Sequence, residues 1–178
     1  MHILGVVLAG GRSSRMGRDK ALLEHVSGVS FLDYAFGRIS PLVASIAISG
    51  RELDSNNVEC VPDQTPGLGP AMAVWSTILF AKQRHFSVIL VTPIDMPDLE
   101  TMHLQRLVQS AVADQPTCVT FDGVNPHPLV AIYPVSLEGE LQVVAHSARR
   151  SLRAWLASRP HVLVKLPATA QRDFNEPE

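Results

Sequence analysis

The fold is decided by residues 3–20, which read ILGVVLAGGRSSRMGRDK. Ile3–Ala9 is a near-continuous apolar run, and it ends at a pair of glycines. Such a run is typical of a strand that is buried on both faces, as the strands of parallel sheets are. The stretch therefore predicts a buried strand whose carboxyl end leads directly into a glycine-rich, basic loop.

The loop after this strand combines glycines with cationic side chains. Gly10 and Gly11 permit a tight turn and the close approach of backbone N–H groups to a ligand. Arg15 and Lys20 can bring positive charge to phosphate oxygens. The combination predicts a phosphate-cradling loop, and the competing interpretation is a plain glycine turn with solvated basic residues. The spacing excludes an ordinary P-loop, because Lys20 follows Asp19 rather than a glycine. It also excludes a G-x-G-x-x-G dinucleotide loop, because the glycines stand at Gly10, Gly11 and Gly17.

Further apolar runs alternate with helical patterns along the rest of the chain. Strands are predicted at Ile46–Ser49, Val58–Val61, Ser87–Val91, Cys118–Phe121, Leu129–Tyr133 and His161–Leu166. Helices are predicted from the cap Ser30 through Ile39, at Pro70–Lys82, from the cap Asp98 through Val112, and at Leu152–Leu156. This alternation predicts an α/β protein, a three-layer α/β/α sandwich with a mostly parallel, Rossmann-like sheet.

The composition describes an ordinary globular protein. The 178 residues are 46% hydrophobic with a formal net charge of −2, which excludes dominant disorder and predicts a single domain spanning residues 1–178. The near balance of acidic and basic residues argues against nucleic-acid binding. No apolar run reaches the roughly 18 residues of a membrane span, and Ile3–Ala9 lacks the flanks of a signal peptide. We therefore expect a cytoplasmic protein with no nucleic-acid or membrane partner, in which Cys60 and Cys118 are buried free thiols.

Ligands of such sheets bind at the carboxyl ends of the strands. The predicted places are the residues just after Ala9, Ser49, Val61, Val91 and Tyr133. Asp95 lies shortly after one of these strands, between two prolines that restrict the backbone. Its carboxylate suits a Mg²⁺ ion that bridges nucleotide phosphates, and the competing interpretation is an ordinary turn aspartate beside proline.

Two further side chains are candidates on their chemistry. Asp63 follows the strand at Val58–Val61, and its carboxylate can accept hydrogen bonds from a base or a ribose; the alternative is a turn aspartate after Pro62. His127 lies between prolines, where histidine is more often structural than catalytic. No Ser or Cys stands at a recognisable triad spacing, and the histidines form no zinc motif.

The sequence also resembles a known family. Residues 8–23, LAGGRSSRMGRDKALL, resemble the opening signature of the molybdenum cofactor guanylyltransferases, L-A-G-G-x-S-x-R-M-G-x-D-K-A-L-L. The resemblance continues through PD at 62–63, PGLGP at 66–70 and TPIDMP at 92–97. It reaches HPL at 127–129 and DFNEPE at 173–178, so it covers nearly the whole chain in the expected order.

The resemblance implies a fold of the nucleotide-diphospho-sugar transferase type and a Mg²⁺-dependent nucleotidyltransferase. The implied reaction moves GMP from GTP to the terminal phosphate of molybdopterin or Mo-molybdopterin, which forms the guanine dinucleotide form of the molybdenum cofactor and releases pyrophosphate. It gives catalytic roles to Arg15, Lys20 and Asp95, with Asp95 as the metal ligand. The implied nucleotide-binding residues are Leu8, Ala9, Gly10, Gly11, Lys20, Ser49, Asp63 and Asp95. His127 and Asn175 are implied on the pterin side.

Two other functions stay open on the sequence. One is a related transferase, such as a molybdopterin cytidylyltransferase or a sugar-nucleotide pyrophosphorylase. The other is a nucleotide- or cofactor-binding carrier without turnover. The altered tail favours this carrier, because relatives usually end with a motif close to N-x-N-T-P-E, whereas residues 173–178 here read DFNEPE. The intact Arg15, Lys20 and Asp95 favour an enzyme. The resemblance also implies transient contacts with cofactor-delivering or molybdoenzyme-chaperone proteins.

Overall fold

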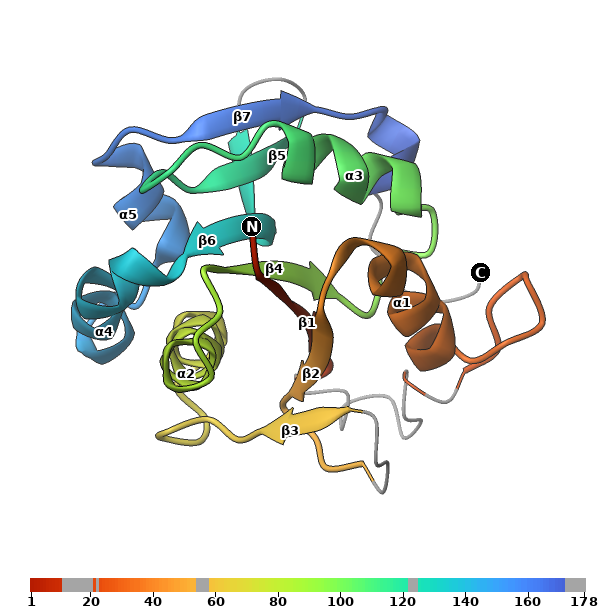
Figure 1. The fold of residues 1–178 in the computed structure, drawn as a ribbon, viewed down its shortest axis with the longest axis horizontal. Helices are drawn as coiled ribbons and strands as arrows, with labels where there is room; N and C mark the ends of the chain where they lie inside the picture. The colour runs from red at the N-terminus through yellow and green to blue at the C-terminus, as the bar shows by residue number, and fades with distance from the viewer. Residues whose placement is uncertain (11–20, 22, 54–57, 122–124, 172–178) are drawn as a thin grey trace.

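One sheet of seven strands organises the computed structural model, which describes residues 1–10, 21, 23–53, 58–121 and 125–171 (Figure 1). The strands are β1 (Ile3–Leu8), β2 (Ser45–Ser49), β3 (Glu59–Val61), β4 (Val88–Pro93), β5 (Thr117–Phe121), β6 (Asn125–Pro134) and β7 (Val162–Lys165). Their order across the sheet is β3-β2-β1-β4-β6-β5-β7. The central strand is β4, and the strands that pair with it on either side, β1 and β6, are both distant from it in the sequence.

The sheet is mostly parallel, as predicted. β1 pairs in parallel with β2 and with β4, and β3 continues the parallel arrangement beyond β2. β6 is antiparallel to both β4 and β5, while β7 is parallel to β5. Among the strands that the structure describes, β6 alone runs against the others. The carboxyl ends of β1 to β4 consequently meet at one edge, and β6 begins at that same edge.

The direction of β6 corrects one predicted site position. The residue after Tyr133 is Pro134, which pairs with Val88 at the start of β4 and so lies at the opposite edge. The prediction was wrong because it assumed that this strand runs parallel to the rest. β6 also begins at Asn125, earlier than the predicted Leu129, so its first residues and not its last ones reach the candidate site.

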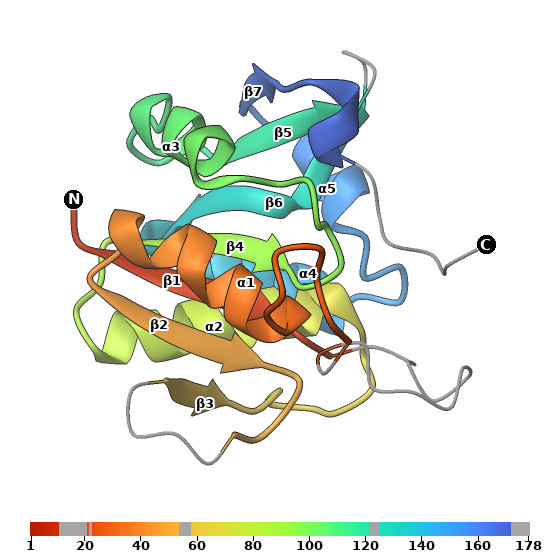
Figure 2. The same cartoon turned by 90° about the vertical axis from the view of Figure 1, so that its right-hand side faces the viewer.

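Helices cover both faces of the sheet, which confirms the three layers (Figure 1 and Figure 2). α1 (Phe31–Ile39) and α3 (Thr101–Gln109) contribute to the core on one face. α2 (Pro70–Gln83), α4 (Glu138–His146) and α5 (Leu152–Ala157) contribute to the core on the other. Short 3-10 turns lie at Ser40–Leu42, Val135–Leu137 and Ala168–Gln171. No helix in the described part of the chain has the length and apolar character needed to cross a membrane.

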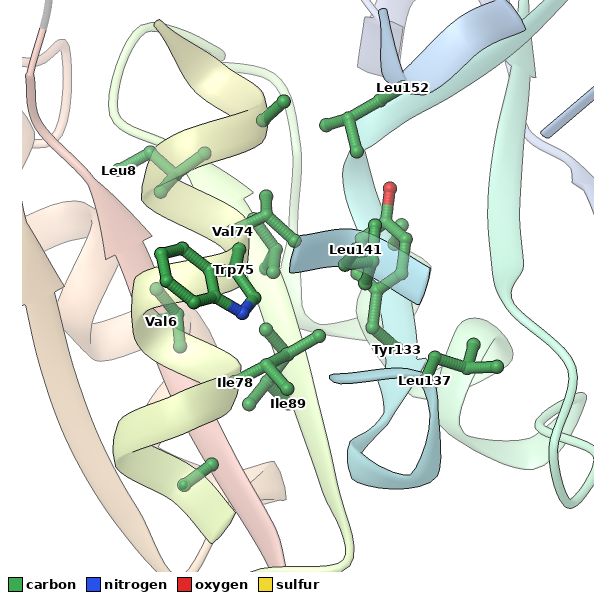
Figure 3. Close-up of a cluster of buried hydrophobic side chains, with 14 of the residues drawn as sticks. Val6, Leu8, Val74, Trp75, Ile78, Ile89, Tyr133, Leu137, Leu141 and Leu152 are labelled. Carbon is green, nitrogen blue, oxygen red and sulfur yellow. The ribbon is translucent and has the colours of Figure 1, made fainter. Parts of the chain in front are cut away.

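The core beneath α2 shows why the strands are so apolar. Every residue of β1 is buried, because helices cover both of its faces. Val6 of β1 and Ile89 of β4 gather with Trp75 and Ile78 of α2 in one cluster (Figure 3). The fully buried Tyr133 joins this cluster, and its hydroxyl donates a hydrogen bond of 2.6 Å to the carbonyl of Pro128. That bond satisfies the one polar atom of an otherwise apolar side chain.

The helix boundaries follow local capping in one case and tertiary contacts in another. Ser30 caps α1 as predicted, because its hydroxyl oxygen accepts a hydrogen bond of 3.0 Å from the N–H of Asp33. Asp98 does not cap α3. Glu100 takes that place, and its N–H donates to Nδ1 of His103 at 3.1 Å. α3 starts later than predicted because Leu99 is fully buried and its carbonyl accepts a hydrogen bond from the Arg38 guanidinium rather than from an N–H group of the helix.

The structure also differs from the predicted helices at α3 and α4. α3 ends at Gln109 rather than at the predicted Val112, which is exposed rather than packed in the core. α4 was not predicted at all. Leu141 and Ala145 are its only buried side chains, and the remaining positions are mostly polar, so the sequence carries little apolar periodicity there.

The two cysteines are free thiols, but the prediction that both are buried holds only for Cys118. Burial raises the pKa of the Cys118 thiol to about 12, so it stays protonated and unreactive at neutral pH. Cys60 is only partly buried because it lies on β3, at the end of the strand order. Its sulfur accepts a hydrogen bond of 3.2 Å from the N–H of Leu53.

The ends of β1 and β2 meet at two glycines. Gly50 has a φ of +88°, and a Cβ added there would lie 2.3 Å from the Cα of Gly10. A Cβ on Gly10 would in turn lie 2.9 Å from the Cα of Gly50. Gly10 is therefore required by the packing of the protein backbone itself, in addition to any approach of a ligand.

Gly50→Ala should lower the free energy of unfolding by more than about 2 kcal/mol, because positive φ alone costs roughly 1–2 kcal/mol and the clash with Gly10 adds to it. Gly67→Ala is the matched control, since Gly67 has a φ of +80° but nothing within 4 Å of an added Cβ. Its free energy of unfolding should fall only by the roughly 1–2 kcal/mol that positive φ costs. Urea unfolding measures both, and equal losses would contradict a tight contact between the two strand ends.

Candidate active site

The register of the sheet aligns the strand ends that carry the candidate residues. Leu8 of β1 lies between Ser49 of β2 and Pro93 of β4, and Ser49 pairs in turn with Val61 of β3. β2 and β4 point to the same side of the molecule in Figure 2. These four residues form a row across the sheet, and the chain leaves the sheet just beyond it on each strand.

The predicted residues follow this row at equal spacing. Gly10, Asp63 and Asp95 each come two positions after their member of the row, and Ser49 is itself a member. The structure therefore brings these residues to one edge, as the sequence predicted. Gly11, Arg15, Lys20 and Asn175 lie outside the described residues.

Leu8 and Ala9 use backbone groups to build this edge. The N–H of Ala9 donates to the carbonyl of Ser49 at 2.9 Å, which extends the pairing of β1 and β2. The carbonyl of Leu8 accepts from the N–H of Ile94 at 3.1 Å, which joins β1 to the turn after β4. These two residues thus fix the positions at which the loops after β2 and β4 leave the sheet.

Ser49 and Asp63 face each other with unsatisfied polar atoms. Ser49 is 1% exposed, and neither its hydroxyl oxygen nor Oδ1 of Asp63 has a well-formed hydrogen bond to a described residue, although both atoms are buried. Burial raises the pKa of Asp63, and the nearby Ser49 hydroxyl opposes this rise. Buried polar atoms without partners are uncommon in folded proteins, and here they indicate a position where a ligand can supply the missing bonds.

Asp95 lies on a turn between two buried neighbours. Ile94 and Met96 are buried in the core, whereas Asp95 between them keeps part of its surface exposed. No Lys, Arg or His among the described residues lies within ion-pair distance of its carboxylate. Its charge nevertheless acts on Arg38 and on His127, since it raises the pKa of both. The carboxylate therefore stands at the edge with capacity for a further cation.

The surroundings of Asp95 fit a magnesium ion that arrives with a nucleotide. Within the described residues, no three His, Cys, Asp or Glu side chains gather into a protein-only metal cluster. Mg²⁺ in nucleotide sites is usually held by one or two carboxylates together with substrate phosphates, so such a cluster is not required. A partly exposed carboxylate that forms no ion pair with a described residue supplies the hard oxygen ligand of that arrangement.

Arg38 is the site residue that the sequence reasoning missed. It is 3% exposed and extends from α1 beneath the turn that carries Asp95. Burial lowers the pKa of Arg38 to about 10, and the charges of Tyr34 and Asp95 oppose this change. The guanidinium therefore remains charged at neutral pH. A signal was present in the sequence, because Arg38 occupies the apolar face of α1, three positions after the buried Ala35.

His127 reaches the same edge from the opposite strand direction. It lies within β6 rather than in a loop, and it is 9% exposed. Burial lowers the pKa of His127 to about 4, its own backbone hydrogen bond and Asp95 raise it, and the charge of Arg153 lowers it further. Nδ1 accepts a bond of 3.3 Å from the N–H of Leu129. The ring is therefore neutral at pH 7.

An open, mostly parallel sheet with unpaired polar atoms beyond its strand ends is typical of α/β enzymes that bind nucleotides. Comparison with known protein families identifies which of these nucleotide-binding families the chain resembles. Residues 5–162 match the model of the MobA-like NTP transferase domain, and the chain belongs to this family. The family resemblance found in the sequence is confirmed.

The curated relatives are similar over nearly the full chain. A probable molybdenum cofactor guanylyltransferase of Rhodopirellula baltica is 40% identical, over 98% of this chain and 88% of the relative. A molybdenum cofactor guanylyltransferase of Sinorhizobium fredii is 35% identical, over 94% of this chain and 80% of the relative.

Solved structures share the fold at much lower identity. The molybdopterin-guanine dinucleotide biosynthesis protein A of Archaeoglobus fulgidus has a TM-score of 0.68 at 22% identity, over 91% of this chain and 83% of that one. The 2-C-methyl-D-erythritol 4-phosphate cytidylyltransferase of Thermus thermophilus has a TM-score of 0.68 at 16% identity, over 99% and 94%. At these identities the likeness confirms the predicted type of fold.

The depressed pKa of His127 predicts a loss of stability in mild acid. Well above pH 6.5 the ring is neutral in the folded and in the unfolded chain. As the pH falls from 6.5 towards about 4, the unfolded chain takes up a proton that the folded chain does not, so stability is lost. The stability lost at His127 over this pH range is on the order of 3 kcal/mol.

His127→Gln should remove this share and flatten the pH dependence of the unfolding free energy between pH 6.5 and 4. Urea denaturation at a series of pH values measures it. The ring protons of His127 in an NMR titration give an independent reading, and a midpoint near 6.5 would show that burial does not act on this ring.

Proposed function

We propose that this chain transfers GMP from GTP to the terminal phosphate of molybdopterin or Mo-molybdopterin and releases pyrophosphate. The observation that carries the proposal is the gathering of Ser49, Asp63 and Asp95 at one edge of a MobA-like NTP transferase sheet. The guanylyltransferase names of the relatives at 40% and 35% identity support GMP as the transferred group.

Ser49 and Asp63 are the proposed contacts to the nucleoside. The Asp63 carboxylate accepts hydrogen bonds from N–H or O–H groups, and the Ser49 hydroxyl both donates and accepts. Beyond the contact between these two side chains, their buried atoms have no well-formed bond to a described residue, so a nucleoside can supply the missing bonds. This is the arrangement in which a substrate lacking the matching group is rejected most strongly.

Asp95 is the proposed ligand of Mg²⁺, and Arg15 and Lys20 are proposed on the family signature to contact the phosphates. When bound, the metal would withdraw charge from the phosphate oxygens of the nucleotide. The residues of the chain hold the triphosphate in line with the acceptor and neutralise its crowded negative charge. Gly10 and Gly11 let the backbone approach the phosphates closely.

The acceptor requires no general base from the protein. Its terminal phosphate monoester is largely ionised near pH 7, because its second pKa lies near about 6. An acceptor oxygen attacks the α-phosphorus, a new P–O bond forms, and the bond to the β-phosphate breaks as pyrophosphate leaves. His127, with a pKa of about 4, is too weak a base for neutral pH, which agrees with the lining role on the pterin side that the resemblance implies for it. The resemblance implies the same role for Asn175.

Within this proposal the chain works in the cytoplasm and meets its delivery proteins or molybdoenzyme chaperones only transiently. A cytidylyltransferase and a carrier without turnover remain as outcomes of the experiments below, which use purified full-length protein.

GTP with Mg²⁺ should bind more tightly than CTP, ATP or UTP by at least about tenfold, which corresponds to about 1.4 kcal/mol. Titration calorimetry under one set of buffer conditions measures the four affinities. Equal or tighter binding of CTP would place the chain among the cytidylyltransferases. Tight GTP binding without release of pyrophosphate in the presence of molybdopterin would make it a carrier.

Asp95→Asn keeps the size of the side chain and removes the charge that a hard cation prefers. Turnover with GTP and Mg²⁺ should fall by at least about 100-fold, while the melting temperature without ligands changes little. Asp98→Asn is the matched control, because Asp98 lies exposed on the same turn and should retain activity. A fully active Asp95→Asn variant would refute the metal assignment.

A further inference from the structure

The Arg38 guanidinium binds one short segment of chain at four points. Its Nη2 donates to the hydroxyl of Thr92 at 2.8 Å and to the carbonyl of Pro93. Its Nη1 donates to the carbonyl of Met96 and, at 3.3 Å, to that of Leu99. All four acceptors lie between residues 92 and 99, on either side of Asp95.

The acceptors are neutral, which makes this arrangement unusual. A buried guanidinium is normally paired with a carboxylate, because removing its charge from water is costly. Here no Asp or Glu among the described residues forms an ion pair with Arg38, and backbone carbonyls take that place. An apolar side chain of similar length could fill the volume at lower cost, so packing alone does not account for the arginine.

The guanidinium imposes a shape on the turn. Carbonyls of Pro93, Met96 and Leu99 converge on one guanidinium, which holds the chain between them in a turn. Ile94 and Met96 are held in the core, so the residue between them is the one that faces the edge. That residue is Asp95.

His25 fixes the same segment at a further point. Its Nδ1 accepts from the N–H of Ser27 at 3.1 Å, which leaves Nε2 to donate to the carbonyl of Pro97 at 3.2 Å. The ring stacks on Tyr34 at a centroid distance of 3.8 Å, and the Arg38 guanidinium lies 5.7 Å from the centre of the Tyr34 ring. His25, Tyr34 and Arg38 thus form a continuous support beneath the turn.

We propose that Arg38 is a positioning residue that fixes the turn at residues 93–99 so that Asp95 meets the divalent cation of the bound nucleotide. The proposal rests on the assignment of Asp95 in the proposed function, and it adds a residue outside the family motifs quoted above. Arg38 itself contacts neither nucleotide nor metal.

Arg38→Met tests the proposal, because methionine retains the apolar stem and removes every donor. The Mg²⁺ concentration for half-maximal turnover should rise by about tenfold or more, with a smaller change in kcat at saturating Mg²⁺. Two readouts do not depend on turnover. Binding of Mn²⁺ in the presence of GTP, followed by electron paramagnetic resonance, should weaken by a similar factor, and backbone hydrogen exchange at residues 94–99 should accelerate.

Arg38→Lys is the second variant, chosen because it keeps the charge in case the methionine variant does not fold. An ammonium has three donor hydrogens and cannot serve all four acceptors, so this variant should show the same changes to a smaller extent. Leu141→Ala is the control for lost stability, since Leu141 is fully buried on the opposite face of the sheet. It should lower the melting temperature and leave the Mg²⁺ dependence unchanged.

The outcomes separate the two proposals. Unchanged Mg²⁺ dependence, Mn²⁺ binding and exchange in Arg38→Lys would overturn the positioning role while Asp95→Asn remains inactive. A shift as large in Leu141→Ala would also overturn it, because general destabilisation would then explain the effect. If Asp95→Asn is fully active, the metal assignment fails first, and the positioning role toward a cation fails with it.

Discussion

The pairing of β1 with β2 and β4 is the constraint on which the rest of the structure depends. β1 is buried at every residue, so its backbone N–H and C=O groups cannot be satisfied by water and must pair with the neighbouring strands. That pairing fixes a single register, in which Leu8, Ser49 and Pro93 stand side by side. The loops that carry the candidate residues leave the sheet at one height for this reason.

The candidate site is where the protein accepts polar groups that its core otherwise excludes. Ser49 and Asp63 hold buried atoms without well-formed bonds to described residues, and Arg38 holds a buried charge against carbonyls. Such groups reduce the stability of a fold unless they are satisfied. Ser49 and Asp63 hold such atoms at the ends of two paired strands, on the same edge as Asp95, which agrees with a site that is completed by its ligand.

The solved neighbours show which part of the molecule is general. A cytidylyltransferase and a molybdopterin-guanine dinucleotide biosynthesis protein match this chain with the same TM-score of 0.68, at 16% and 22% identity. The sheet and its layers are therefore the shared part, and a shared fold does not by itself set the function.

The sequence by itself determined the elements whose burial is uniform or strictly periodic. The continuous apolar run of β1, the capped start of α1 at Ser30 and the proline start of α2 were readable because they depend on neighbours in sequence. The strand-end rule then located Asp63 and Asp95. The signature of residues 8–23 identified the family.

Only the tertiary structure decided the place of β6 in the sheet, the delayed start of α3 and the role of Arg38. β6 is antiparallel to β5 because only residues 122–124 separate the two strands, and a connection that short permits antiparallel pairing alone. No local pattern encodes that β6 rather than β5 lies beside β4, which precedes it by more than thirty positions in the chain. α3 begins late because the Leu99 carbonyl is bound by a guanidinium from α1. An arginine on an apolar helix face acquires its acceptors only when a distant turn folds over it, so its function follows from packing and not from its own sequence context.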